Sequence, residues 1–184
     1  MISVSTIINT TAAYAESCEL TLWNLPEAVV GKLKYGMPIK DAARIVSKKQ
    51  GAKVYVKSSK DSELIMFKPQ YQSTFNYIVL GAVSGRLTKV VVSYSEEFQK
   101  KVGGFDNALT AVTKRLSDTT GNNPLDSENS SDYTTFTTFW RVHGGVRLEV
   151  VGEEAKSRVF IRYTCVDMEA DLVKAAAKKI DFGF

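Results

Sequence analysis

Alternating apolar and polar residues dominate the stretch from Asp132 to Asp167. Its sequence, DYTTFTTFWRVHGGVRLEVVGEEAKSRVFIRYTCVD, contains three strand-like runs joined by turn signals at Gly144-Gly145 and Gly152-Glu153-Glu154. Successive side chains of a strand point to opposite faces, so each run presents one apolar face. These faces are Phe136, Trp140 and Val142, then Val146, Leu148 and Val150, then Val159, Ile161, Tyr163 and Cys165. Together they predict an antiparallel sheet whose apolar side must be covered.

The opposite side of the same three runs is aromatic and basic. Aromatic residues and arginine are enriched at protein interfaces, and two aromatic rings on a solvent face exceed what solubility needs. We therefore expect an interaction surface here, and the alternative is that a helix covers this side or that long arginine stems shield it. The candidate binding residues are Phe139, Arg141, His143, Arg147, Phe160 and Arg162.

The same kind of pattern predicts the other elements. Residues 39–50 form a helix with Pro38 at its start and Gly51 just past its end, and Ser84-Gly85 is a hairpin turn. Ser95 caps a further helical stretch, which continues behind Asp106. The predicted strands are 19–23, 52–57, 63–67, 75–83 and 86–94; a helix is expected at 26–33, a polar loop at 121–131 and a last helix at 168–179, capped by Asp167.

This order predicts an α+β fold in which the chain nearly repeats itself. The halves, about 36–94 and 95–184, each consist of a helix followed by antiparallel strands, and they pack as one unit with the C-terminal helix on the sheet. Residues 16–184 would form a single domain, because their length suits one well-buried core. A hydrophobic content of 44% with 24% charged residues excludes a disordered chain.

The first fifteen residues predict a leader. They carry no charge and end in Ala13-Tyr14-Ala15, an A-x-A cleavage pattern, but no basic region precedes them. Residues 1–15 are therefore interpreted as a signal peptide that is truncated at its start, and the alternative is an ordinary N-terminal tail. We expect a periplasmic or secreted protein, with a cytoplasmic location as the alternative, and no stretch is long and apolar enough to span a bilayer.

Two cysteines, Cys18 and Cys165, are consistent with export. An even count in an exported domain predicts one disulfide, here joining the N-terminal segment to the last strand. Closing a loop of that length would contribute about 4–5 kcal/mol in the chain-entropy model. In the cytosol the same residues would be buried thiols.

No catalytic or metal signature emerges. His143, the only histidine, could act as a base or pair with Cys165, but the two fall on opposite faces of the sheet. One histidine and two distant cysteines do not form a zinc site, and no cofactor motif is present. The net charge of +4 favours an acidic partner, whereas the dispersed basic residues argue against nucleic-acid binding.

Two short motifs carry a resemblance to a known family. Gly36-Met37-Pro38 before a helix, and a strand with Gly85, Leu87 and Val90, resemble the small SmpA/OmlA lipoprotein domain, which has a G-M-[TS] helix start and a G-x-L-x-x-[IV] strand ending. Pro38 departs from that pattern, and the lipidated cysteine of the family is absent. The tandem helix-plus-sheet order is also similar to the beta-lactamase inhibitor protein architecture. Both resemblances imply a cell-envelope protein that binds another protein.

The expected function is therefore that of an exported protein-binding module of the cell envelope without catalytic activity. Its partner would be another protein, and the sequence does not specify an oligomeric state. The alternatives are a small enzyme that uses His143 and a cytosolic immunity or chaperone-like protein.

Overall fold

The structure is a computed structural model of the chain. It describes residues 33–50, 53–59, 61–68, 74–121, 124, 126–129, 135–142 and 145–181. Several predicted features lie outside these residues: the leader, the strand at 19–23, Cys18 and His143. Of the predicted helix at 26–33, only Leu33 is described.

Four helices and eight strands make up the described part of the chain. In order they are α2 (Ile39–Gln50), β1 (Lys53–Ser58), β2 (Ser62–Lys68), β3 (Phe75–Val83), β4 (Arg86–Tyr94), α3 (Glu96–Val102), α4 (Phe105–Thr120), β5 (Asp126–Asn129), β6 (Thr135–Val142), β7 (Val146–Glu153), β8 (Arg158–Cys165) and α5 (Val166–Asp181). A single 3₁₀ turn, η1 (Glu154–Lys156), joins β7 to β8. The predicted α+β class is confirmed.

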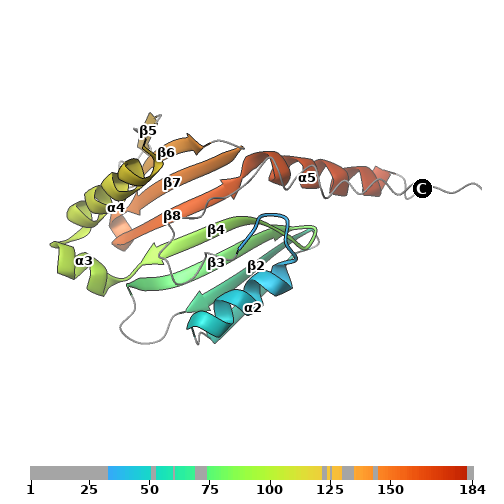
Figure 1. Cartoon of the computed structure of the whole chain (residues 1–184), viewed down its shortest axis with the longest axis horizontal. Helices are drawn as coiled ribbons and strands as arrows, with labels where there is room; N and C mark the ends of the chain where they lie inside the picture. The colour runs from blue at the N-terminus through green and yellow to red at the C-terminus, as the bar shows by residue number, and fades with distance from the viewer. Residues whose placement is uncertain are drawn as a thin grey trace, which may run out of the picture.

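All eight strands form one antiparallel sheet in the order β1-β2-β3-β4-β8-β7-β6-β5. Each half is a hairpin-connected set of four strands, and the last strands of the two halves, β4 and β8, pair at the centre (Figure 1). Exchanging the halves reproduces this order in reverse, so the predicted pseudo-repeat is a structural one. Among the described strands, β1 and β5 form the two outer edges.

One face of the sheet is covered by α2 and α4 (Figure 1). The helices bury Ala42 and Val46 of α2 and Ala108, Val112 and Leu116 of α4. The strand residues beneath them include every apolar residue predicted for the covered side of β7 and β8, and Trp140 of β6. A single hydrophobic cluster contains residues of both halves, which makes the sheet and its helices one packed unit.

The two short motifs of the first half meet in space. The backbone N–H of Gly36 donates to the carbonyl of Leu87 at 2.9 Å, and the N–H of Leu87 donates to the carbonyl of Met37 at 3.0 Å. Pro38 forms an isolated β-bridge with Arg86. Ser84 and Gly85 both have positive φ, which matches the two-residue hairpin turn that the sequence predicts.

Three predicted boundaries are wrong. The polar loop at 121–131 contains β5, which pairs with β6, because an edge strand needs backbone partners on only one side and can be almost wholly polar. The continuation helix begins at Phe105 behind Gly104, so Asp106 lies in its first turn and is not its cap. Asp167 likewise lies inside α5, which begins at Val166 directly after β8.

The C-terminal helix α5 packs on the sheet at its N-terminal end. Met168 is buried in the core cluster, and its side chain contacts the turn at Gly36. Figure 1 shows the later turns of α5 extending beyond the end of the sheet. None of the helices described here is both long and apolar enough to cross a membrane.

Candidate protein-binding face

The face of the sheet opposite α2 and α4, which we call the second face, contains the candidate residues. The strand register carries one row of this face across all eight strands. From β1 to β5 the row reads Tyr55, Met66, Val79, Val91, Arg162, Glu149, Phe139 and Asp126. The first half of the face is therefore apolar in this row, and the second half is mainly charged.

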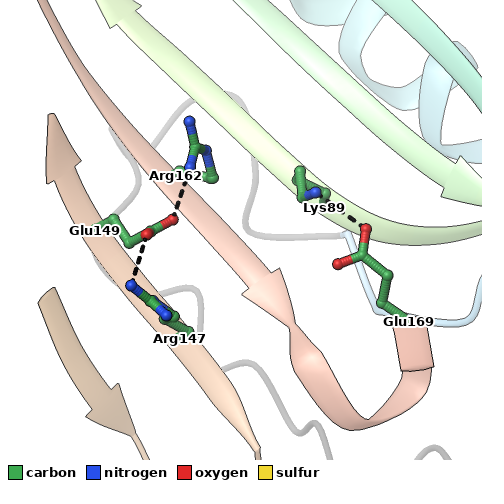
Figure 2. A network of polar contacts seen from close by, with 5 residues as sticks. All are labelled: Lys89, Arg147, Glu149, Arg162 and Glu169. Carbon is green, nitrogen blue, oxygen red and sulfur yellow. Dashed lines mark hydrogen bonds and ion pairs between the residues drawn. The ribbon is translucent and has the colours of Figure 1, made fainter. Parts of the chain in front are cut away.

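Glu149 organises the charged half. Its carboxylate accepts from Arg162 Nη1 on β8 at 3.1 Å, and its other oxygen lies 3.1 Å from Arg147 Nη2 on its own strand (Figure 2). The Glu149 side chain is only 9% exposed, whereas Arg147 and Arg162 are 41% and 38% exposed. The carboxylate is thus held beneath two partly solvated guanidinium groups, and both of these candidate arginines are already paired.

Phe160 lies beside this network. The guanidinium carbon of Arg162 stands 5.7 Å from the centroid of the Phe160 ring, within cation–π range. Phe160 is 8% exposed, so its ring is not presented to solvent. The alternation of β8 predicts an exposed aromatic ring at this position, and the structure shows a buried one.

The other candidate residues are placed only in part. Phe139 and Arg141 belong to β6, where the register sets them opposite Glu149 and Arg147, but their side chains are not among those described. His143 lies outside the described residues, and the enzyme hypothesis that depends on it stays a prediction.

Sequence reasoning missed the apolar residues of the second face on β1 and β2. Tyr55, Leu64 and Met66 are 52%, 43% and 39% exposed, and the register places all three on this face. The signal was present in the run ELIMF, which is apolar at consecutive positions. Such a strand has two apolar faces, and only one of them, with Ile65 and Phe67, is buried under α2.

Lys57 and Lys68 of the same region differ from the arginines, because no acidic partner of either is found among the described residues. Lys57 and Lys68 are exposed, and neither forms an ion pair within the part of the chain that the structure describes. Lys89 on β4, by contrast, pairs with Glu169 of α5 at 3.0 Å (Figure 2). A partner could therefore reach Lys57 and Lys68 without breaking an ion pair within the described part of the chain.

Two buried tyrosines stand apart from this face. Tyr35 and Tyr163 have buried hydroxyls that make no hydrogen bond to any described residue. Burial raises the pKa of both well above the ordinary value of 10.0, and each is raised further by a neighbouring tyrosine or acid. They lie in the core with Met168 and do not form a site with the second face.

The described residues contain no cluster of metal-ligating side chains. No group of three or more His, Cys, Asp or Glu side chains among them could hold a metal ion. Cys165 is fully buried at the end of β8, on the covered face, and its predicted partner Cys18 lies outside the described residues. No protein-family model, curated protein or solved structure matches the chain.

Proposed function

We propose that this chain is an exported protein-binding module of the cell envelope, without catalytic activity, and that it holds its partner on the second face. The observation that carries the proposal is where the exposed apolar side chains lie. Six large hydrophobic side chains are exposed among the described residues, and four belong to the β1–β2 hairpin. Tyr55, Leu64 and Met66 lie on the second face, and Val56 lies on the opposite one. Contiguous exposed apolar side chains with a polar surround are typical of protein interaction sites.

The charged half of the second face supports the same role in a different way. Arg147 and Arg162 remain more than a third exposed although Glu149 pairs with both. Charges of this kind at the rim of an interface act mainly on association rate and salt dependence. The hairpin would supply the contact area, and the arginines, with Phe139 and Arg141, would orient the partner.

Export rests on the Ala13-Tyr14-Ala15 pattern and on the proposed bridge between Cys18 and Cys165. The support for the bridge is that Cys165 is buried and that no described cysteine is a free thiol. Mass spectrometry of protein purified from the envelope of its host tests both points. We expect a mature N-terminus at Glu16 and a disulfide-linked peptide pair under non-reducing digestion; an intact Met1 with two alkylatable thiols contradicts export.

The binding role is tested by capture from the host envelope fraction with quantitative mass spectrometry. We expect the partner recovered by the wild type to fall at least tenfold with Leu64→Thr/Met66→Thr, because burial of such side chains contributes about 1 kcal/mol or more each at an interface core. A matched control replaces Val166 and Val173, the exposed hydrophobic residues of α5, with Thr. A Phe139→Ala/Arg162→Ala variant tests the charged half. Equal recovery by the wild type and by both second-face variants would reject the proposal.

A further inference from the structure

Among the described residues, the outer strand β1 has one edge that no other strand pairs with. It lies at the end of the sheet and pairs with β2 alone. An antiparallel edge strand presents alternate backbone N–H and C=O groups outward, which can pair with a further strand. The ladder between β1 and β2 runs through six consecutive pairs, from Lys53–Lys68 to Ser58–Glu63, without a bulge. This regular ladder gives the free edge the geometry that another strand needs.

The side chains of this edge are apolar on both faces. Tyr55 and Val56 are adjacent in β1, so they point to opposite faces, and they are 52% and 59% exposed. Leu64 and Met66 continue the exposed surface on β2. A strand added beside β1 would cover Tyr55 on one face and Val56 on the other, which no partner docked on a single face can do.

The charge of the hairpin selects the chemistry of the added strand. Residues 53–68 contain four lysines and two acids, a net charge of +2 and half of that of the whole chain. On the second face the described side chains of the hairpin include two exposed lysines, Lys57 and Lys68, and no acid. Opposite charges in facing positions stabilise a pair of strands, and like charges destabilise it. Acidic side chains of an added strand would therefore pair with these lysines.

Lysine on an edge strand also prevents indiscriminate pairing. Protection against unwanted pairing and selective binding are compatible, because a lysine that disfavours pairing with a neutral or basic strand can still pair with an acidic one. In β1, however, the lysines flank exposed Tyr55 and Val56, whereas an edge that is only protected would carry little apolar surface.

We propose that β1 accepts an extended segment of the partner protein, in which apolar residues alternate with Asp or Glu, as a ninth strand of the sheet. This inference rests on the proposed binding function and names the chemistry of the partner. A second copy of the chain is the competing occupant, since its own outer strand β5 has the sequence DSEN. We favour a separate partner because β5 has four residues against the six of β1.

The test uses synthetic peptides of about eight residues, the length of an ordinary strand. One alternates Val with Glu, one alternates Val with Lys, and a third is the Val/Glu peptide with alternate backbone nitrogens methylated. Binding to the full chain is measured by fluorescence anisotropy. We expect the acidic peptide to bind about tenfold or more tightly than the basic one, and methylation to abolish binding because it removes the donors of the ladder.

Two charge reversals locate the site. Lys57→Glu should weaken binding of the acidic peptide about tenfold and strengthen binding of the basic one, whereas Lys48→Glu, at a lysine of α2 that is also exposed, should change neither. Equal binding of the acidic and basic peptides, no binding of either, or full binding of the methylated peptide would overturn the inference. Self-association of the wild type in sedimentation, lost in Lys57→Glu, would overturn it in favour of a second copy. If capture from the envelope depends on Leu64 and Met66 while no peptide binds, this inference fails and the binding function stands.

Discussion

Replacing Glu149 with Gln tests whether the charged half of the second face is a structural network. The change keeps the size of the side chain and removes its charge, so the two contacts of 3.1 Å to Arg147 and Arg162 lose their ionic character. The amide can accept from one guanidinium only, and its NH₂ group then faces the other. The folded state then keeps two neighbouring arginines without the carboxylate that Arg147 and Arg162 share.

The expected cost follows from the exposure of the three side chains. A fully exposed pair contributes about 0.2–1 kcal/mol, and a hydrogen bond to a charged group about 1.5–3 kcal/mol. Glu149 is nearly buried, at 9%, but its partners are about 40% exposed, so solvent screens part of each attraction. We expect a loss of about 1–2 kcal/mol in the free energy of unfolding. For a chain of this length that lowers Tm by about 2–8 °C.

Thermal unfolding followed by circular dichroism measures this shift at low and high salt. Arg44→Gln is the control, because it breaks an ion pair of 2.9 Å whose side chains are 68% and 46% exposed. That pair should contribute less than about 0.5 kcal/mol. In a double-mutant cycle, Glu149→Gln and Arg162→Gln should couple by about 0.5–1 kcal/mol. If Glu149→Gln lowers Tm no more than the control does, the network does not stabilise the fold.

Two further predictions concern the covered face. Because burial raises the pKa of Tyr163 well above 10.0, the folded state holds it neutral while the unfolded chain ionises it; stability should therefore be full below about pH 10 and fall above it, less steeply in Tyr163→Phe. At pH 7 the same variant should be as stable as the wild type or more so by about 1 kcal/mol, since it removes a buried hydroxyl that bonds to no described residue, and a loss above 1 kcal/mol in urea unfolding would refute this. Gly152→Ala should lower the free energy of unfolding by about 1–3 kcal/mol in the same assay, because an added Cβ would lie 2.9 Å from Phe105 Cζ and 3.2 Å from the Leu109 methyl groups. An unchanged urea midpoint would show that α4 can shift to make room for the methyl group.

The covered face was predictable because alternation with a period of two fixes it residue by residue. Each of Val146, Leu148 and Val150 of β7 lies where the sequence predicts, and the same holds for the apolar positions of β8. Ser95 caps α3 as predicted, with its hydroxyl accepting from the N–H of Phe98 at 3.2 Å. These are local signals, and tertiary packing does not compete with them.

The order of the strands was not predictable in the same way. Hairpin turns indicate which neighbours along the chain pair, but nothing local indicates that β4 pairs with β8. β5 has no apolar alternation, because both of its faces are polar in sequence, and only its pairing with β6 makes it a strand. A predicted loop therefore became the second edge of the sheet.

The second face shows how a correct alternation can still misplace the interaction surface. The alternation of side chains along β8 correctly places Phe160 and Arg162 on that face. Alternation shows which face a side chain points to, but it does not show whether that side chain is exposed. Phe160 is buried and Arg162 is paired with Glu149, so the features that drew attention in the sequence are partly satisfied inside the protein. The consecutive apolar residues of β2 look like core in the sequence, and half of them are exposed.

The surface available to a partner is therefore best located by what the fold leaves unsatisfied. By this criterion the arginines of β7 and β8 rank below the lysines of the β1–β2 hairpin, because the arginines have a carboxylate and the lysines have none among the described residues. The exposed apolar side chains and the unpaired backbone edge coincide with those lysines. A partner at this edge could gain apolar contact, backbone hydrogen bonds and charge pairing at one place. A partner on the arginines alone would have to compete with Glu149, which is why the variants of Lys57 and Met66 discriminate between the two surfaces better than any change in the charged half.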